Sequence, residues 1–211
     1  MAMNRQSESM RTFGTVVAIA LVYSFCYRIV PGWVIPNLAP IGALAFYCGY
    51  AGNRWAFALI PLCLMGLSDT VLHFTLGYPA VPSVYVSMVV YTLLGLVGAK
   101  LSWGSRAGLL LGGSVFFFVV TNFGNWLMSR VPFEQLGGAS YAVVPSAIYP
   151  FEIKYANDIW GLLANYGMAL GFLGRTLAAD LGFSAVLVAL TLAFSALPHG
   201  VPVMVRSKNQ S

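Results

Sequence analysis

The sequence predicts an all-α polytopic membrane protein with about six transmembrane helices. Of its 211 residues, 59% are hydrophobic and only 8% are charged, whereas a soluble domain carries about 25% charged residues. So few charged side chains cannot form a water-exposed surface, and the mean hydropathy is +0.79. At about 20 residues per span, the length allows about six spans with short loops. We therefore expect residues 1–211 to form a single integral membrane domain.

Proline, glycine and charged residues separate the apolar stretches and so define the expected spans. Arg5 and Arg11 precede the first stretch, but no small-residue cleavage site follows, so we interpret it as an uncleaved helix rather than a signal peptide. The first five expected spans are residues 12–30, 41–52, 55–76, 83–101 and 107–128. Residues 129–158 are more polar and are expected to form an outer loop or cap.

The last apolar tract, residues 159–197, is too long for one span and marginal for two. Gly171, Gly174, Arg175 and Asp180 interrupt it. Broken helices are tolerated in membranes where they line a cavity. We therefore expect a half-helix, residues 159–170, dipping in from the outer face before a long last span.

The basic residues predict the orientation. If the amino terminus is inside, Arg54, Lys100 and Arg106 all fall in or beside inner loops, as the positive-inside rule requires. Six spans also bring Arg206 and Lys208 to the inside. The net charge of +5 therefore reflects topology. No basic run with interleaved aromatic residues favours nucleic-acid binding.

In this topology several polar residues fall in the outer half of the membrane and predict a pocket that opens outward. Asn122 and Asn125 are three residues apart in an apolar helix, and Trp126 follows. Carboxamides are costly to leave unpaired in hydrocarbon. They therefore either bind a ligand or pair across a helix interface, as membrane asparagines also do. The sequence leaves both interpretations open.

Asp69 is the acidic residue inside the third span, and a carboxylate there is a functional-site hypothesis by default. It could bind a cationic group, carry a proton or pair with Arg175. His73 lies on the same helix face, but the pair lacks a third metal ligand. Arg175 is either a ligand donor or an interfacial side chain that reaches the headgroups. It does not share a helix face with Asp180, so both need partners elsewhere.

Pairs of small residues at four-residue spacing permit close helix approach. They are Gly14 with Ala18, Gly108 with Gly112, and Gly167 with Gly171. No GxSxG, HExxH or Walker motif is present, so we expect no enzyme activity, no cofactor and no metal site.

Three segments together resemble a bacterial family of membrane transport proteins of unknown function. They are residues 36–46 (PNLAPIGALAF), 61–69 (PLCLMGLSD) and 114–126 (SVFFFVVTNFGNW). That family is similar to the substrate-binding S components of energy-coupling factor (ECF) transporters. The chain departs from the family pattern at residues 171–176, where Arg175 stands in place of an asparagine.

The resemblance implies an S-component-like fold that captures a small, vitamin-like solute from the outer face of the bacterial inner membrane. Both termini would then be cytoplasmic, and a transmembrane coupling subunit with ATPases would be the partner. We expect the pocket to be lined by Asp69, Asn122, Asn125 and Arg175, with Trp126 and Asn37 at its rim. The rival hypotheses are a non-transporting structural subunit of a larger complex and, with less support, a membrane-embedded enzyme.

Overall fold

The computed structural model describes residues 2–30, 38–52, 54–77, 79–128 and 155–196. Within these ranges the chain forms six α-helices and one 3-10 helix. Their bounds are α1 (Ala2–Ile29), α2 (Ile41–Gly52), η1 (Trp55–Ala58), α3 (Leu59–Leu76), α4 (Pro82–Gly98), α5 (Trp103–Met128) and α6 (Ile159–Ala196). Four helical segments are long and apolar enough to cross a membrane. The predicted all-α, polytopic membrane fold is thus confirmed.

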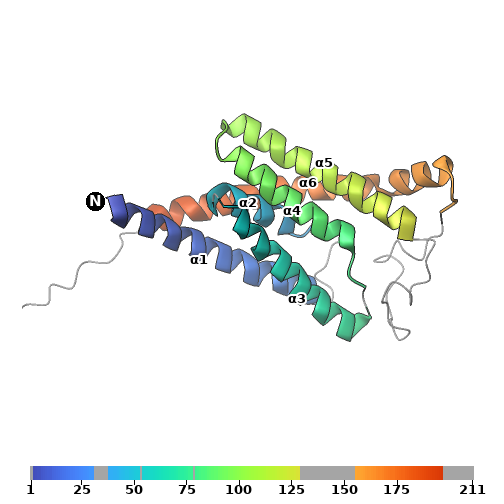
Figure 1. Ribbon diagram of the computed structural model, residues 1–211, viewed down its shortest axis with the longest axis horizontal. Coiled ribbons are helices and arrows are strands. Elements are labelled where there is room, and N and C mark those ends of the chain that lie inside the picture. The colour runs from blue at the N-terminus through green and yellow to red at the C-terminus, as the bar shows by residue number, and fades with distance from the viewer. Residues whose placement is uncertain (1, 31–37, 53, 78, 129–154, 197–211) are drawn as a thin grey trace, which may run out of the picture.

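Successive helices run in opposite directions along the bundle (Figure 1). Helices α1, α3 and α5 run one way, and α2, α4 and α6 return, so α1 begins where α6 ends. Arg11, Arg54, Lys100 and Arg106 lie at or near that end, which we call the basic end. The end at which α1, α3 and α5 finish is called the opposite end.

Helix α2 is the centre of the bundle. Ten of its 12 residues are buried, and it contacts all the other helices. A helix that is apolar on every side is expected to be buried in this way. Leu44 and Cys48 are completely shielded, and Tyr47 stacks on Phe13 of α1 with 5.9 Å between the ring centroids.

Helices α2 and α4 touch backbone to backbone at two glycines. A Cβ atom at Gly49 would overlap the carbonyl oxygen of Thr92, and one at Gly95 would overlap the carbonyl oxygen of Phe46. Small residues allow such close approach between membrane helices. The glycines in the pairs expected from sequence spacing do not mark helix contacts. A Cβ atom would meet nothing within 4 Å at Gly14, Gly108, Gly112, Gly167 or Gly171.

Helix α2 has the predicted bounds, but it covers only part of the bundle. Its 12 residues span about 18 Å, short of a hydrocarbon core of about 30 Å. Its first turn is level with the middle of α4 and α6, because Gly42 lies against Tyr91 and Asp180. Its last turn reaches the basic end, where Ala51 lies near Glu8 of α1. The half-length helix of this protein is therefore α2.

The half-helix predicted at residues 159–170 is wrong. Helix α6 continues without a break for 38 residues, from Ile159 to Ala196. Glycine inside a helix costs only about 1 kcal/mol relative to alanine, so Gly171 and Gly174 are insufficient to end it. No proline lies in this range to remove a backbone hydrogen bond. Arg175 and Asp180 leave the helix by different faces without disturbing it.

Candidate functional site: two carboxylates between the helices

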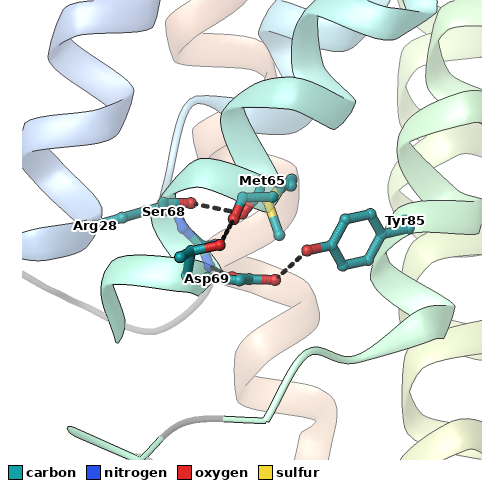
Figure 2. A network of polar contacts seen from close by, with 7 residues as sticks. Arg28, Met65, Ser68, Asp69 and Tyr85 are labelled. Atoms are coloured by element: carbon teal, nitrogen blue, oxygen red, sulfur yellow. Dashed lines mark hydrogen bonds and ion pairs between the residues drawn. The ribbon is translucent and has the colours of Figure 1, made fainter. Parts of the chain in front are cut away.

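Asp69 of α3 joins three helices near the opposite end (Figure 2). Its Oδ1 forms an ion pair with Nη2 of Arg28, in the last turn of α1. Its Oδ2 accepts a hydrogen bond of 2.6 Å from the hydroxyl of Tyr85, in the first turn of α4. The neighbouring Ser68 hydroxyl instead donates to the carbonyl of Met65 within α3, at 3.0 Å. Asp69 therefore pairs with Arg28, and the predicted alternative partner, Arg175, is wrong.

The ion pair is only partly shielded, with 19% of the Arg28 side chain and 10% of the Asp69 side chain exposed. Arg28 also stands at the carboxyl end of α1, where the helix dipole favours a cation. The buried Nε of Arg28 has no hydrogen-bond partner among the described residues. One donor of the guanidinium thus remains available next to the carboxylate.

Asn122 of α5 serves the contact between α5 and α6. Its Nδ2 donates to the carbonyl of Phe118 in its own helix, at 2.7 Å. The carboxamide of Asn165 on α6 donates to the backbone carbonyl of Asn122, also at 2.7 Å. The hydroxyl of Tyr166 donates to the carbonyl of Val119 at 2.8 Å. Side chains of α6 thus bind two carbonyl groups of α5, whereas the carboxamide of Asn122 bonds a carbonyl of its own helix rather than crossing the interface.

The remaining predicted site residues lie apart from this contact. The indole of Trp126 donates to the carbonyl of Ala156 at 3.0 Å, and Asn125 is half-buried. Arg175 is exposed, with its guanidinium carbon 5.6 Å from the ring centroid of Phe172 on the same helix. Asn37 lies outside the described residues. No hydrogen bond or ion pair within the described ranges joins Asp69 to Asn122 or Arg175, and the binding role of these residues stays a prediction.

Asp180 of α6 is the second carboxylate, and sequence reasoning did not select it as a site residue. Only 1% of it is exposed. Its Oδ2 accepts hydrogen bonds from the Tyr91 hydroxyl on α4 and from the Ser114 hydroxyl on α5, the latter at 2.7 Å. A backbone N–H, that of Ala43 in α2, also donates to the carboxylate. Residues from four helices therefore meet at one anionic group.

The first turn of α2 explains why the chain places a carboxylate there. The first N–H groups of a helix have no partner within the helix, and the helix dipole places partial positive charge at this end. Because α2 begins in the middle of the bundle, an acceptor from a neighbouring helix can bind these groups. Asp180 supplies the acceptor, and the absence of a side chain at Gly42 lets it approach, since a Cβ atom there would lie 2.5 Å from Oδ1.

Two hollows on the described part of the chain can be compared with the predicted site. One, of about 290 Å³, lies at the basic end between α1, α2 and α6, and its polar lining includes Glu8, Thr12 and Ser195. The other, of about 640 Å³, is an apolar groove on α1 beside Ile19 and Val22. Neither is lined by the predicted substrate-binding residues. No group of three or more His, Cys, Asp or Glu within the described ranges could hold a metal ion.

The comparisons with known proteins place the chain in a family without giving it an activity. Residues 7–199 match a family of unknown function, DUF6580. No curated protein and no solved structure matches the chain. Since the matched region covers almost the whole length, the chain belongs to the DUF6580 family.

Proposed function

We propose that the protein is an integral membrane transport component that captures a small solute at the opposite end of the bundle. Its charged and polar side chains differ between the two ends. The basic end carries Arg11, Arg54, Lys100 and Arg106 at helix ends and loops. The positive-inside rule then assigns this end, with both chain termini, to the cytoplasm of a bacterial inner membrane. The opposite end, which carries Arg28 and Asp69, would face outward.

The observation that carries the proposal is the group formed by Arg28, Asp69 and Tyr85. Ionisable residues inside membrane bundles are rare and usually mark substrate or ion pathways. This group holds a cation, an anion and a hydroxyl from three different helices within one contact (Figure 2). The unpaired Nε of Arg28 adds a free donor. A small polar solute with a carbonyl or carboxylate could exchange for one of these contacts when it binds.

The likeness to S components, which rests on the sequence segments alone, further suggests association with a transmembrane coupling subunit and ATPases. In that arrangement this chain binds the solute and the partners supply the energy.

Native mass spectrometry of the purified protein, with a search for a retained small molecule, tests the proposal. We expect the wild type and Arg54→Gln, a change at the basic end, to retain the same solute. We expect Tyr85→Phe, which removes only a hydroxyl, to retain less of it, and Arg28→Gln/Asp69→Asn to retain none. Retention that is unchanged in the double variant would refute the assignment of this group as the binding site.

A second candidate, a structural subunit of a larger membrane complex, is favoured by one observation. Of the polar side chains expected to line a pocket, Asp69 pairs with Arg28 and Tyr85 of neighbouring helices, and Trp126 donates to the carbonyl of Ala156. This candidate predicts that the protein leaves the membrane in a complex of fixed composition and retains no small molecule. The same mass spectra, recorded after extraction in a mild detergent, distinguish the two functions.

A further inference from the structure

We propose that Asp180 is a reversible proton-binding site in the centre of the bundle, reached from the hollow at the basic end along α6. Within the proposed transport component, this proton would control the position of α2, while the partner ATPases supply the energy. That role rests on the proposed function, whereas the protonation of Asp180 does not. The site is distinct from the group around Asp69, which lies near the opposite end and is balanced by Arg28.

The surroundings of Asp180 suit a proton better than a metal cation. Two hydroxyl groups and one N–H group donate hydrogen bonds to the carboxylate, and an N–H group cannot ligate a metal. No charged side chain contacts it among the described residues. Of the helices packed around it, α4 presents the titratable Tyr91, α5 presents Ser114 and α2 presents only backbone. On α1, the titratable groups on the side of α6 are Tyr23, which contacts Phe183, and the buried Tyr27, whose ring stacks on Tyr23.

Helix α6 carries a row of polar residues from Asp180 towards the basic end. Ser184, Thr191 and Ser195 follow at spacings that keep them on one face. Thr191 shares a hydrogen bond of 2.7 Å with the hydroxyl of Tyr47 on α2. Thr191, Ser195 and Tyr47 line the hollow of about 290 Å³. Because Ser195 is exposed, the row leads from the surface of the basic end into the bundle.

Two buried hydroxyl groups indicate water between this hollow and Asp180. Ser24 of α1 is 0% exposed, and neither its Oγ nor that of Ser184 has a hydrogen-bond partner among the described residues. The rings of Tyr23 and Phe183 are 5.9 Å apart, which brings these turns of α1 and α6 to the same level. Other buried hydroxyls of the chain, such as Thr92, bond the carbonyl one turn earlier. Buried polar atoms without protein partners are typical sites of bound water.

One apolar residue interrupts the row of polar residues on α6, between Ser184 and Thr191. Leu187 lies between Ser184 and Thr191 on the same face of α6 and is only 4% exposed. It belongs to the same core cluster as Val16 of α1 and Leu44 of α2, which are completely buried. This layer closes the path in the described conformation. Proton uptake therefore requires water to pass Leu187, after which a proton from bulk water binds a carboxylate oxygen and later returns to bulk water.

Protonation would also loosen the first turn of α2. A neutral carboxylic acid has one acceptor site fewer and one donor more than the carboxylate. A hydrogen bond to a charged acceptor is about twice as strong as one to a neutral acceptor, so the bond from the Ala43 N–H of α2 weakens when the proton binds. Binding of the proton to Asp180 would therefore change the position of α2 in the bundle.

Infrared difference spectroscopy of the protein in lipid, recorded while the pH is lowered, tests this proposal. We expect a carbonyl stretching band of a protonated, buried carboxyl group to grow, to shift in D₂O and to be lost in Asp180→Asn. Asp158→Asn is the matched control, since it removes an exposed carboxyl at the start of α6 and keeps a side chain that caps Gly161. If Asp180→Asn does not fold, Tyr91→Phe must still shift the band, because it removes one donor.

The access path is tested by the rate at which the band shifts after transfer to D₂O. Leu187→Ser should speed this shift, whereas Leu192→Ser, the same change at an exposed site on α6, should leave it unchanged. A band that persists in Asp180→Asn, an Asp180 that stays ionised until the protein unfolds, or equal rates in the two leucine variants would overturn the proposal. Failure to find a retained solute would count against the transport function and not against the proton site.

Discussion

Asp69 and Asp180 each accept a hydrogen bond from a tyrosine of α4, yet their charges are stabilised in different ways. Asp69 is neutralised by the guanidinium of Arg28 and is partly exposed at one end. Asp180, at the centre, contacts neutral donors and no cation within the described ranges. The comparison shows that a membrane bundle stabilises a buried charge either by a counter-charge or by oriented dipoles. Five substitutions separate these two modes.

The largest effect is expected for Asp180→Ala. It leaves three buried donors without an acceptor, each worth about 1–3 kcal/mol, so we expect a loss of about 3–5 kcal/mol of stability. Thermal unfolding of the purified protein in detergent measures this. Asp180→Asn should lose much less, because the amide oxygen still accepts hydrogen bonds. Equal losses in the two variants would show that the donors do not depend on Asp180.

Arg28→Ala is expected to rank second. It leaves Asp69 without a counter-charge, but the pair is partly exposed, so we expect about 2 kcal/mol, below the 3–5 kcal/mol typical of a fully buried pair. The same unfolding assay, applied to Asp69→Ala and to the double variant, gives the coupling energy. If the losses in the two single variants add up to the loss in the double variant, the two side chains do not act as a pair.

Gly42→Ala should be destabilising for a steric reason. Its Cβ atom would lie 2.5 Å from Oδ1 of Asp180, and the carboxylate would have to leave the first turn of α2. We expect a loss of about 1–2 kcal/mol, as is usual for overpacking. Gly66→Ala on α3 is the control, since a Cβ atom there would meet nothing within 4 Å. A gain of stability at both positions would contradict the close contact.

The smallest effects are expected when either tyrosine loses its hydroxyl. Tyr91→Phe should cost about 1–2 kcal/mol and Tyr85→Phe about 0.5–1 kcal/mol, because removing a donor to a fully buried acceptor costs more. Both variants keep the ring, so the difference between their unfolding midpoints reports the hydrogen bonds alone. A reversed order would mean that Asp69 relies on its hydroxyl partner more than Asp180 does.

Helix boundaries could be predicted from the sequence where a proline or a glycine ends a helix. Pro40 and Gly77 flank segments whose predicted bounds, 41–52 and 55–76, agree with the structure. Gly77 ends α3 in the left-handed conformation, with φ of 72°, which glycine adopts without strain. The prediction of a break in α6 was wrong because glycine weakens a helix but does not end it.

The site around Asp180 was harder to predict from the sequence, because the residues that bind Asp180 are distant from it in the chain. The hydrogen bonds of Asp180 connect it to Ser114 and Tyr91, 66 and 89 positions away. Nothing in local periodicity indicates such a pairing. The glycines at which helices truly touch, Gly49 and Gly95, likewise belong to different helices, so a search for pairs within one helix cannot find them. One signal was present and not used: a 12-residue apolar segment is too short to span a bilayer.

The shortness of α2 has a consequence for how the protein is made. A segment of 12 residues is too short to be inserted as an independent transmembrane helix during synthesis. Its close contact with α4 through Gly49 and Gly95 forms only after residues up to 98 have left the ribosome. The central helix is therefore expected to enter the membrane late, drawn in by a partner that is translated after it.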